Sequence, residues 1–259
     1  MTKRTKRVLF YSAVVIFAFL SFVVILYAQG YKYSFSGLRF FRTGAIYVKA
    51  NEDAKVYMDD KFLNSTSFFS NSYTVKGLLP GQYTIRIQKD NFSSWQKNIT
   101  VEEGLVSEFS KAMLLPKSGE AKDNFVLEIK TLLTPPKKSL LPSMPATPTE
   151  PFYIKNGVLF KTMENGETER LSYLVSGFAL SPDDKKLSWW NGNELWVMWL
   201  SDMDYQPYRK ASDKDLITRF STKIKNAAWF RDSDHLVVDS GGYKVLEIDK
   251  RGGLNIIEI

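Results

Sequence analysis

The chain has 259 residues, no cysteine, a single histidine and a formal charge of +7 at pH 7. Without cysteine, disulfides, thiolate ligands and thiol nucleophiles are excluded, and one histidine, His235, excludes a multi-histidine metal site. The first seven residues supply +4 of the net charge, and the small remainder of +3 argues against nucleic acid as a partner.

Residues 8–28, VLFYSAVVIFAFLSFVVILYA, contain no charged side chain and follow four cations: Lys3, Arg4, Lys6 and Arg7. At about 1.5 Å per residue they make a helix of roughly 32 Å, which matches a hydrocarbon core of about 30 Å. The sequence therefore predicts one transmembrane helix. Because cations favour the cytoplasmic side, residues 1–7 form a cytoplasmic leader and the chain after Ala28 is extracytoplasmic.

Two other interpretations of residues 8–28 compete with the anchor. A cleaved secretory signal has a shorter apolar region and small residues before its cleavage site, whereas Leu26 stands three positions from a cut after Ala28. A buried core helix would have a polar face and a cap residue. Residues 29–42 form a juxtamembrane segment, with Tyr31 and Tyr33 suited to the lipid–water boundary.

Residues 43–115 are predicted to form a small antiparallel β-sandwich. Short runs of β-branched and aromatic residues alternate with polar ones, and turn residues separate them about every 10 residues. In one run, Tyr83, Ile85 and Ile87 share a face. The expected strands are Ala45–Ala50, Lys55–Asp59, Tyr73–Gly77, Gln82–Gln88, Trp95–Val101 and Glu108–Leu115.

This region resembles the PEGA domain, a small β-sandwich of bacterial and archaeal surface proteins. The residues that carry the resemblance are Gly44-x-Ile46-x-Val48, Ala54-x-Val56-Tyr57-Met58-Asp59-Asp60, Leu79-Pro80-Gly81-x-Tyr83-x-Ile85-x-Ile87, Asn91-Phe92-x-x-Trp95 and Val101-x-x-Gly104. The Pro-Glu-Gly-Ala signature stands here as Asn51-Glu52-Asp53-Ala54. The resemblance implies surface display and binding of envelope or protein partners, without established catalysis.

Seven of the ten prolines lie between Pro116 and Pro151, so residues 116–151 are predicted to be a Pro-rich linker. The alternative is a Pro-rich ligand for a recognition domain. Within the linker, Phe125–Leu133 is more apolar and is expected to dock as an edge strand.

Residues 152–259 contain an internal repeat. The segments that begin at Gly177 and Asn226 align without gaps at an offset of 49 residues. Each reads as strand, Asp-rich turn, strand, Gly turn and strand, and resembles a blade of a TolB-like or WD-repeat β-propeller. Asn156-Gly157 and Asn165-Gly166 are expected hairpin turns of an earlier blade portion. Because a closed ring needs about four blades, we expect an open, propeller-like domain.

The partner-binding candidates are four aromatic residues of this domain. Core packing is the ordinary role of such tryptophans; the binding hypothesis is that Trp189 and Trp199 present indole rings on the outward face of an incomplete sheet. Tyr205 and Tyr208 lie in the insertion Asp202–Asp215, a long loop of the kind that often binds partners.

No catalytic, metal or cofactor site is expected. The pairs Asp202/Asp204, Asp213/Asp215 and Asp232/Asp234 do not have EF-hand spacing and are better explained as turn residues. Only residue type favours Asp183 or Glu194 as glycosidase carboxylates.

The sequence thus predicts a mainly β, single-pass membrane protein without catalytic activity. Its partners would be the lipid bilayer and an envelope protein or glycan. The alternative function is a carboxylate-dependent enzyme acting on cell-wall or surface glycans.

Overall fold

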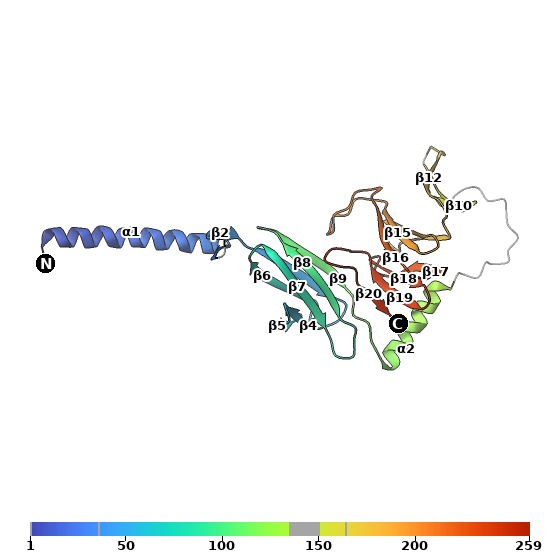
Figure 1. Cartoon of the computed structure of the whole chain (residues 1–259), viewed down its shortest axis with the longest axis horizontal. Helices are drawn as coiled ribbons and strands as arrows, with labels where there is room; N and C mark the ends of the chain where they lie inside the picture. The colour runs from blue at the N-terminus through green and yellow to red at the C-terminus, as the bar shows by residue number, and fades with distance from the viewer. Residues whose placement is uncertain (1, 36, 135–150, 164) are drawn as a thin grey trace. The chain divides into compact units, whose positions relative to one another are not determined.

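The computed structural model describes residues 2–35, 37–134, 151–163 and 165–259 (Figure 1). These residues form one long apolar helix at the start of the chain, followed by a mainly β structure of several small sheets, none of which is closed. The predicted mainly β class is therefore confirmed. The chain divides into two compact units, a first unit of residues 1–86 and 98–112 and a second unit of residues 87–97 and 113–259.

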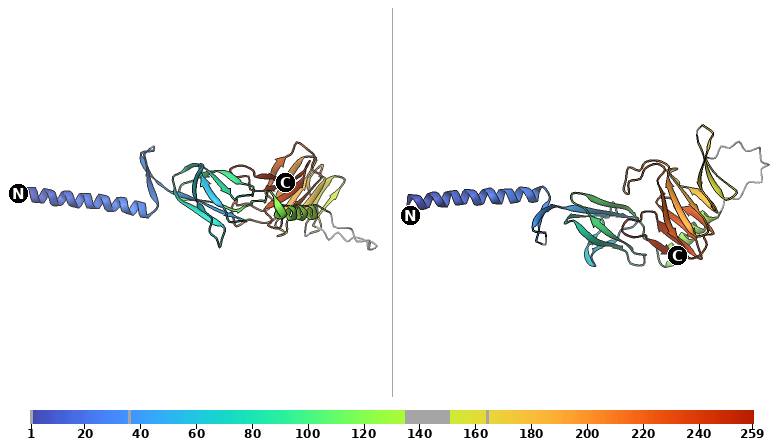
Figure 2. Two further views of the ribbon diagram at one scale, coloured as in Figure 1. Left: turned by 90° about the horizontal axis from the view of Figure 1, so that it is seen from below. Right: turned by 45° about the horizontal axis from the view of Figure 1, so that its top comes forward.

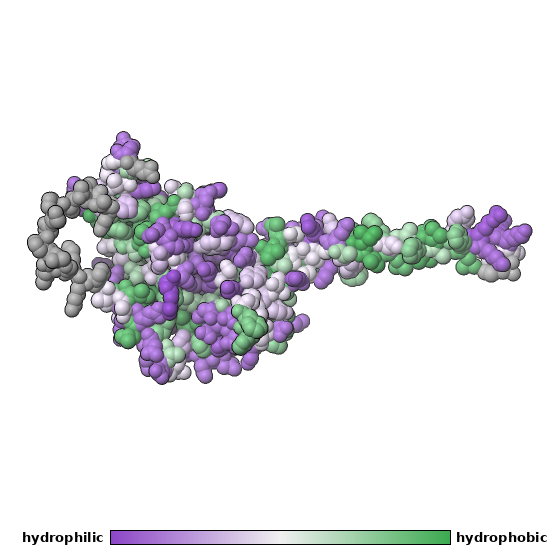
Figure 3. All heavy atoms as spheres, turned by 180° about the vertical axis from the view of Figure 1, so that it is seen from behind, coloured by the Kyte–Doolittle hydropathy of each residue, from purple (hydrophilic) through white to green (hydrophobic). Residues whose placement is uncertain are grey.

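Helix α1 (Lys3–Ala28) contains the predicted apolar stretch, and none of its residues is buried. The Thr2 hydroxyl caps its start by accepting the Thr5 N–H at 3.3 Å. Figure 3 shows the apolar part of the helix in green, next to its hydrophilic N-terminal end in purple. The helix is long and apolar enough to span a membrane or to be a signal sequence. Since it buries no residue, it is not a core helix.

The first unit continues with a hairpin and two small sheets, in which the end of β7 (87–88) and the start of β8 (95–97) belong to the second unit. The hairpin pairs β1 with β2, and the sheets have the orders β6-β3-β9 and β5-β4-β7-β8, with β3 and β9 parallel. β8 has the predicted bounds, whereas β1, β2 and β5 were not predicted. The strands are β1 (Tyr31–Ser34), β2 (Arg39–Arg42), β3 (Gly44–Ala50), β4 (Lys55–Met58), β5 (Lys61–Ser65), β6 (Ser72–Leu78), β7 (Gly81–Gln88), β8 (Trp95–Val101) and β9 (Val106–Ala112).

The second unit contains three antiparallel sheets with consecutive strand order, β10-β11-β12, β13-β14-β15-β16 and β17-β18-β19-β20 (Figure 1). Their strands are β10 (Phe152–Lys155), β11 (Val158–Thr162), β12 (Thr168–Ser172), β13 (Gly177–Leu180), β14 (Lys186–Trp190), β15 (Glu194–Trp199), β16 (Lys214–Arg219), β17 (Asn226–Trp229), β18 (His235–Asp239), β19 (Tyr243–Glu247) and β20 (Ile256–Glu258).

The two four-stranded sheets are the two copies of the predicted repeat. β13 and β17 start 49 residues apart, and so do β14 and β18, and β15 and β19. The turn after the first strand takes a positive φ at Asp184 (56°) in one copy and at Ser233 (61°) in the other. Each copy has four strands instead of the expected three. The fourth strand is β16, which begins at the end of the predicted insertion, in the first copy and β20 in the second.

Asn156 and Gly157 form the predicted hairpin turn between β10 and β11. Both have a positive φ, 52° and 73°, as a two-residue type I′ turn requires. The segment 152–172 therefore forms a three-stranded sheet of its own.

Helix α2 (Gly119–Leu133) corrects the expectation of an edge strand over Phe125–Leu133. Phe125, Ile129 and Leu133 are four residues apart, so a helix places them on one face, whereas a strand would place them too far apart to pack together. That face packs on β17 and β18, with Ile129 fully buried. Residues 135–150, which carry five of the seven prolines of the predicted linker, lie outside the described residues.

Candidate functional site

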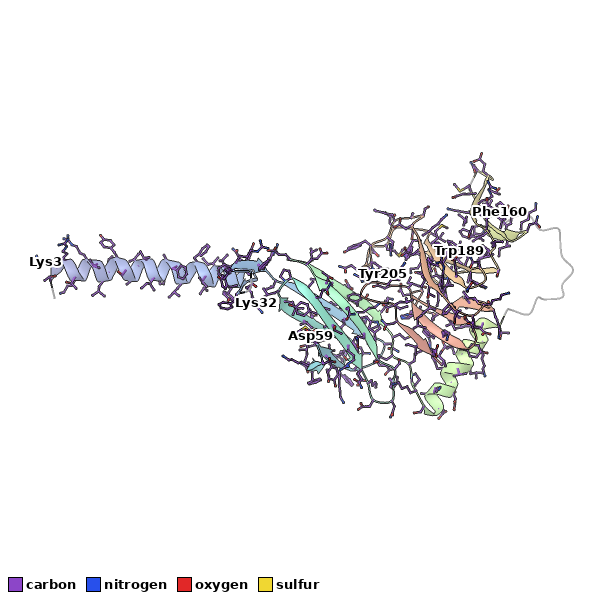
Figure 4. The ribbon with its side chains drawn as sticks, in the orientation of Figure 1. Lys3, Lys32, Asp59, Phe160, Trp189 and Tyr205 are labelled. Atoms are coloured by element: carbon purple, nitrogen blue, oxygen red, sulfur yellow. The ribbon has the colours of Figure 1, made fainter. Side chains whose placement is uncertain are left out.

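Trp189 and Trp199, for which we considered an outward face as the binding hypothesis, lie in the core. Each is only 2% exposed, so the alternative interpretation of core packing describes them. Trp189 stacks on Trp196 at 6.0 Å between ring centroids, and its position is labelled in Figure 4. Side chains alternate along β15. Val197 and Trp199 join one hydrophobic cluster, while Met198 joins another. Both faces of this sheet are covered, which is why neither indole reaches the surface.

The loop that carries Tyr205 and Tyr208 connects β15 to β16. Its base is held by the Asp202 carboxylate, which accepts hydrogen bonds from the Lys210 ammonium at 2.8 Å and the Ala211 N–H at 2.9 Å. A second clamp joins the Arg209 guanidinium to Asp215 at 2.5 Å, over the Trp199 ring. The loop is therefore anchored at its base and includes a cis peptide bond between Gln206 and Pro207.

The two tyrosines of this loop have different surroundings. The Tyr205 hydroxyl donates to Asp234 at 3.0 Å, and burial together with the Asp234 charge raises the pKa of this phenol. Tyr208 is 70% exposed. Of the four predicted contact residues, Tyr208 is therefore the one with a largely free side chain, while Tyr205 is half-buried and bonded inside the unit.

A buried ammonium lies beneath this loop. Lys186, at the start of β14, is 1% exposed, and its Nζ lies 3.4 Å from both Asp183 Oδ2 and Asp234 Oδ1. The Tyr205 ring lies 5.8 Å away. Burial raises the pKa of Asp183, but hydrogen bonds from Ser181, the Lys185 N–H and the Lys186 ammonium outweigh it, so the pKa is lowered. The cluster links one copy of the repeat to the other.

The equivalent position in the second copy is His235. Its ring is buried, and its Nδ1 lies 2.7 Å from Asp232 Oδ2. Asp232 also accepts the N–H groups of Asp234 and His235 at its other oxygen. Burial raises the pKa of Asp232, yet the His235 and backbone hydrogen bonds prevail and lower it. Asp183 and Asp232 thus have the same role in the two copies. Each closes its turn by accepting one or two backbone N–H groups and contacts a buried basic side chain, Lys186 or His235.

A second buried ion pair lies in the same unit. Lys97 of β8 is 0% exposed, and its ammonium lies 3.1 Å from Glu247 Oε2. It also donates to the carbonyls of Asp249 and Gly253 at 2.5 and 2.6 Å, so its three N–H groups have three acceptors. Glu247 Oε2 additionally accepts the Trp95 indole N–H at 3.0 Å. Burial dominates over the Lys97 charge and raises the pKa of Glu247.

The two carboxylates considered for glycoside hydrolysis are both occupied by hydrogen bonds. Glu194 accepts from Trp196, Arg219 and Asn191, and these bonds lower the pKa of Glu194 to about 2. The pKa of Asp183 is lowered as well. A general acid needs the opposite shift, so neither group is suited to donate a proton near neutral pH.

The aspartate pairs considered as calcium ligands serve turns and ion pairs. Asp202 and Asp213 bind the loop, Asp215 binds Arg209, and Asp232 closes its own turn. No group of three or more potential ligand side chains from His, Asp and Glu gathers within the described ranges.

A small pocket lies in the second unit at α2. It has a volume of about 110 Å³, and its lining includes Leu115, Lys122, Phe125 and Ile257. Sites that enclose a small organic ligand typically have about 300–1,000 Å³. This pocket is too small for such a ligand.

Sequence reasoning missed Lys97, Lys186 and Glu247. One signal was present for Lys186 and His235, because each opens an apolar strand at the same position of the repeat. No local signal could link Lys97 to Glu247, which lie 150 residues apart in the sequence. A comparison with protein-family models and with curated proteins finds no match to this chain.

Proposed function

We propose that this chain is a single-pass membrane protein whose extracytoplasmic β domains bind or scaffold an envelope protein or glycan, without catalysis. The observation that carries the proposal is α1, an apolar helix that buries none of its residues and leads into β-rich units. An unburied apolar surface of this length needs a bilayer around it. The four cations before it orient the N-terminus toward the cytoplasm.

The PEGA-like assignment of the first unit is part of this proposal. Its support is the pair of small sheets β6-β3-β9 and β5-β4-β7-β8, with Ile46 and Val48 on one and Val56 and Ile85 on the other fully buried. Two sheets that each bury one set of alternate residues suit a β-sandwich. The resemblance to the PEGA domain implies that this unit is displayed at the surface and binds a partner.

The propeller-like assignment of the second unit belongs to the same proposal. Its support is the repeated four-stranded sheet with consecutive strand order, as in a propeller blade. Open sheets leave edge strands that can accept another segment. The exposed Tyr208 on the long loop of the first copy is the residue we assign to partner contact.

Localisation is tested first, on the full chain expressed in a bacterial host. We expect it to remain with membranes after alkaline carbonate extraction, at its full mass. Protease added to spheroplasts should degrade the β units. A chain that is shortened by cleavage after residue 28 and released in soluble form would contradict the proposal.

Binding is tested on the same full chain by photo-crosslinking in intact envelope. A crosslinked product should form with the unchanged protein, weaken strongly in Tyr208→Ser, and persist in the matched control Tyr173→Ser, since Tyr173 is also exposed at 59%. Equal crosslinking of all three proteins would contradict the role given to Tyr208. Release of soluble saccharide from isolated envelope, lost in Glu194→Gln, would favour the glycan-directed enzyme instead.

A further inference from the structure

The hairpin β1–β2 directly follows α1 and carries exposed apolar groups at its tip. Phe35 is 85% exposed and Leu38 is 75% exposed. Leu38 also has a φ of 49°, a conformation that is costly for a branched residue and that glycine or asparagine would adopt more easily. The fold itself gives no reason for a large apolar side chain at this position.

The hairpin is fixed to the end of α1 at its base. The backbone N–H of Thr43 donates to the Gly30 carbonyl at 2.8 Å, and the Thr43 hydroxyl donates to the same oxygen at 2.7 Å. Gly30, with a φ of 86°, turns the chain out of the helix. The Lys32 ammonium adds a bond to the Gly77 carbonyl at 2.7 Å. The base of the hairpin is therefore held at the level where the apolar helix ends.

The two faces of the hairpin combine aromatic rings with cations. Tyr33 packs edge-on against Phe35 and Phe40, each at 5.2 Å between centroids. On the other face, the Arg39 guanidinium lies 4.3 Å from the centre of the Phe41 ring. Residues 29–42 include three cations, Lys32, Arg39 and Arg42, and no acidic residue. Aromatic rings with lysine and arginine are the composition of protein at a lipid–water interface.

Figure 2 shows the hairpin projecting to the side of the helix end in both of its views, and Figure 4 labels Lys32 beside that end. If α1 spans a bilayer, a hairpin that leaves sideways from its end lies along the membrane surface.

We propose that the β1–β2 hairpin is a second, interfacial contact with the membrane, in which Phe35 and Leu38 enter the headgroup region and the three cations attract anionic lipid. This inference rests on the proposed anchoring by α1. Continuity with that helix and complementary charge identify the bilayer as the occupant of this exposed tip.

The first unit offers an internal control. Phe68 and Phe69, in the loop after β5, are 85% and 95% exposed. That loop adjoins the far end of β3, because the Ala50 N–H donates to Asn71, whereas Thr43 precedes the near end. Seven residues of β-strand span about 23 Å, so this loop stays clear of the surface that the hairpin contacts.

The absence of cysteine allows a direct test with single-cysteine variants of the full chain. Leu38→Cys and Phe69→Cys are each labelled with an environment-sensitive fluorophore and reconstituted into vesicles of phosphatidylcholine and phosphatidylglycerol. We expect aqueous iodide to quench the label at position 38 several-fold less than the label at 69. Lipids with a nitroxide on the headgroup should quench only the label at 38.

A second variant places the label at Phe35→Cys. Adding Leu38→Ser and Arg39→Gln to it should restore iodide quenching, and vesicles of phosphatidylcholine alone should give weaker shielding. Comparable iodide quenching at positions 38 and 69, in protein that floats with the vesicles, would overturn the hairpin inference and leave the proposed anchor intact. Shielding without quenching by the nitroxide lipid would mean that protein covers the tip, and would also overturn it. Protein that does not float with the vesicles would overturn both.

Discussion

The two copies of the repeat in the second unit share a strand plan but bury charge differently. In the copy β13–β16, Lys186 takes its carboxylates from its own turn, at Asp183, and from the other copy, at Asp234. In the copy β17–β20, the same position is His235, whose Nδ1 lies 2.7 Å from its own Asp232. The shared plan is thus a turn carboxylate that faces a buried basic side chain. Only the lysine adds an ion pair to the hydrogen bonds that already join the copies, from the Asp183 N–H to Ser233 and from the Trp229 indole to the Ala179 carbonyl.

The second copy also carries a buried carboxylate that the first copy does not have. Glu247 stands 49 residues after Met198, and its cation, Lys97, comes from β8 outside the repeat. A duplicated backbone can therefore hold an apolar residue in one copy and half of an ion pair in the other. The two copies differ at this position because β8, outside the repeat, supplies a cation for Glu247 of the second copy.

The largest effect is expected for Lys97→Met. Breaking a buried ion pair on one side leaves Glu247 without its cation, so we expect the free energy of unfolding at pH 7 to fall by about 3–5 kcal/mol. Urea unfolding followed by tryptophan fluorescence measures it. Lys223→Met, at an exposed lysine, is the matched control and should change stability by less than about 0.5 kcal/mol.

The pH dependence of this loss identifies its cause. The folded pKa of Glu247 is raised above its unfolded value of about 4.3, so its contribution favours folding below that value and is lost as the pH rises through the folded pKa. Removing Lys97 takes away a charge that lowers this pKa. The difference in the free energy of unfolding between Lys97→Met and the unchanged protein should therefore become smaller as the pH is lowered toward about 4.3. If this difference in the free energy of unfolding stays constant with pH, the loss comes from packing and not from the charge of Glu247.

A smaller loss is expected for Lys186→Met in the first copy. Asp183 is about one third exposed and can be hydrated again, so we expect about 1.5–3 kcal/mol, the range for hydrogen bonds to charged groups. Unfolding of Lys185→Met, whose side chain is exposed, provides the comparison. If the two variants are equally stable, the tie between the copies contributes nothing.

His235→Leu should cost less again, about 1 kcal/mol, because it removes one hydrogen bond from Asp232, which is one quarter exposed and retains two backbone donors. His235→Asn, which can still place an N–H near Asp232, should recover part of this loss. A loss from His235→Leu as large as that from Lys186→Met would remove the distinction between the copies.

Tyr208→Ser should have the smallest effect on stability, within about 0.5 kcal/mol, because its side chain is mostly in water. The long loop after the third strand belongs to the first copy alone, so this variant tests whether the loop serves binding and not folding. Trp199→Ser, beneath the same loop, should instead cost about 3–5 kcal/mol. Thermal unfolding of both variants separates the two roles.

The sequence was a good guide to those parts of the fold that depend on local pattern. The uncharged run 8–28 gave α1, and the offset of 49 residues placed equivalent strands of the two copies. Asn156-Gly157 gave its hairpin turn because both residues accept a positive φ. Helix α2 was missed since prolines on either side concealed the four-residue spacing of Phe125, Ile129 and Leu133.

The candidate site was harder to predict because burial depends on what packs on each face. The alternation of a strand places Trp199 and Met198 on opposite faces, but the sequence pattern does not tell whether each face is covered. Lys97 and Glu247 meet only after distant strands have assembled. Tyr205 and Tyr208 could both be placed in a loop from the sequence, but loop position alone does not separate the exposed Tyr208 from Tyr205, which is bonded to Asp234.

The two hydrogen bonds between Thr43 and Gly30 have a mechanical consequence. Tension applied to the rest of the first unit would pass from β3 through Thr43 to the Gly30 carbonyl, and so to α1, without stretching residues 31–42. The hairpin then lies outside the path of the load and can keep its own contacts while the anchor is pulled. If these two bonds broke, the load would pass to the β1–β2 pairing, and opening that hairpin would lengthen the tether by residues 31–42.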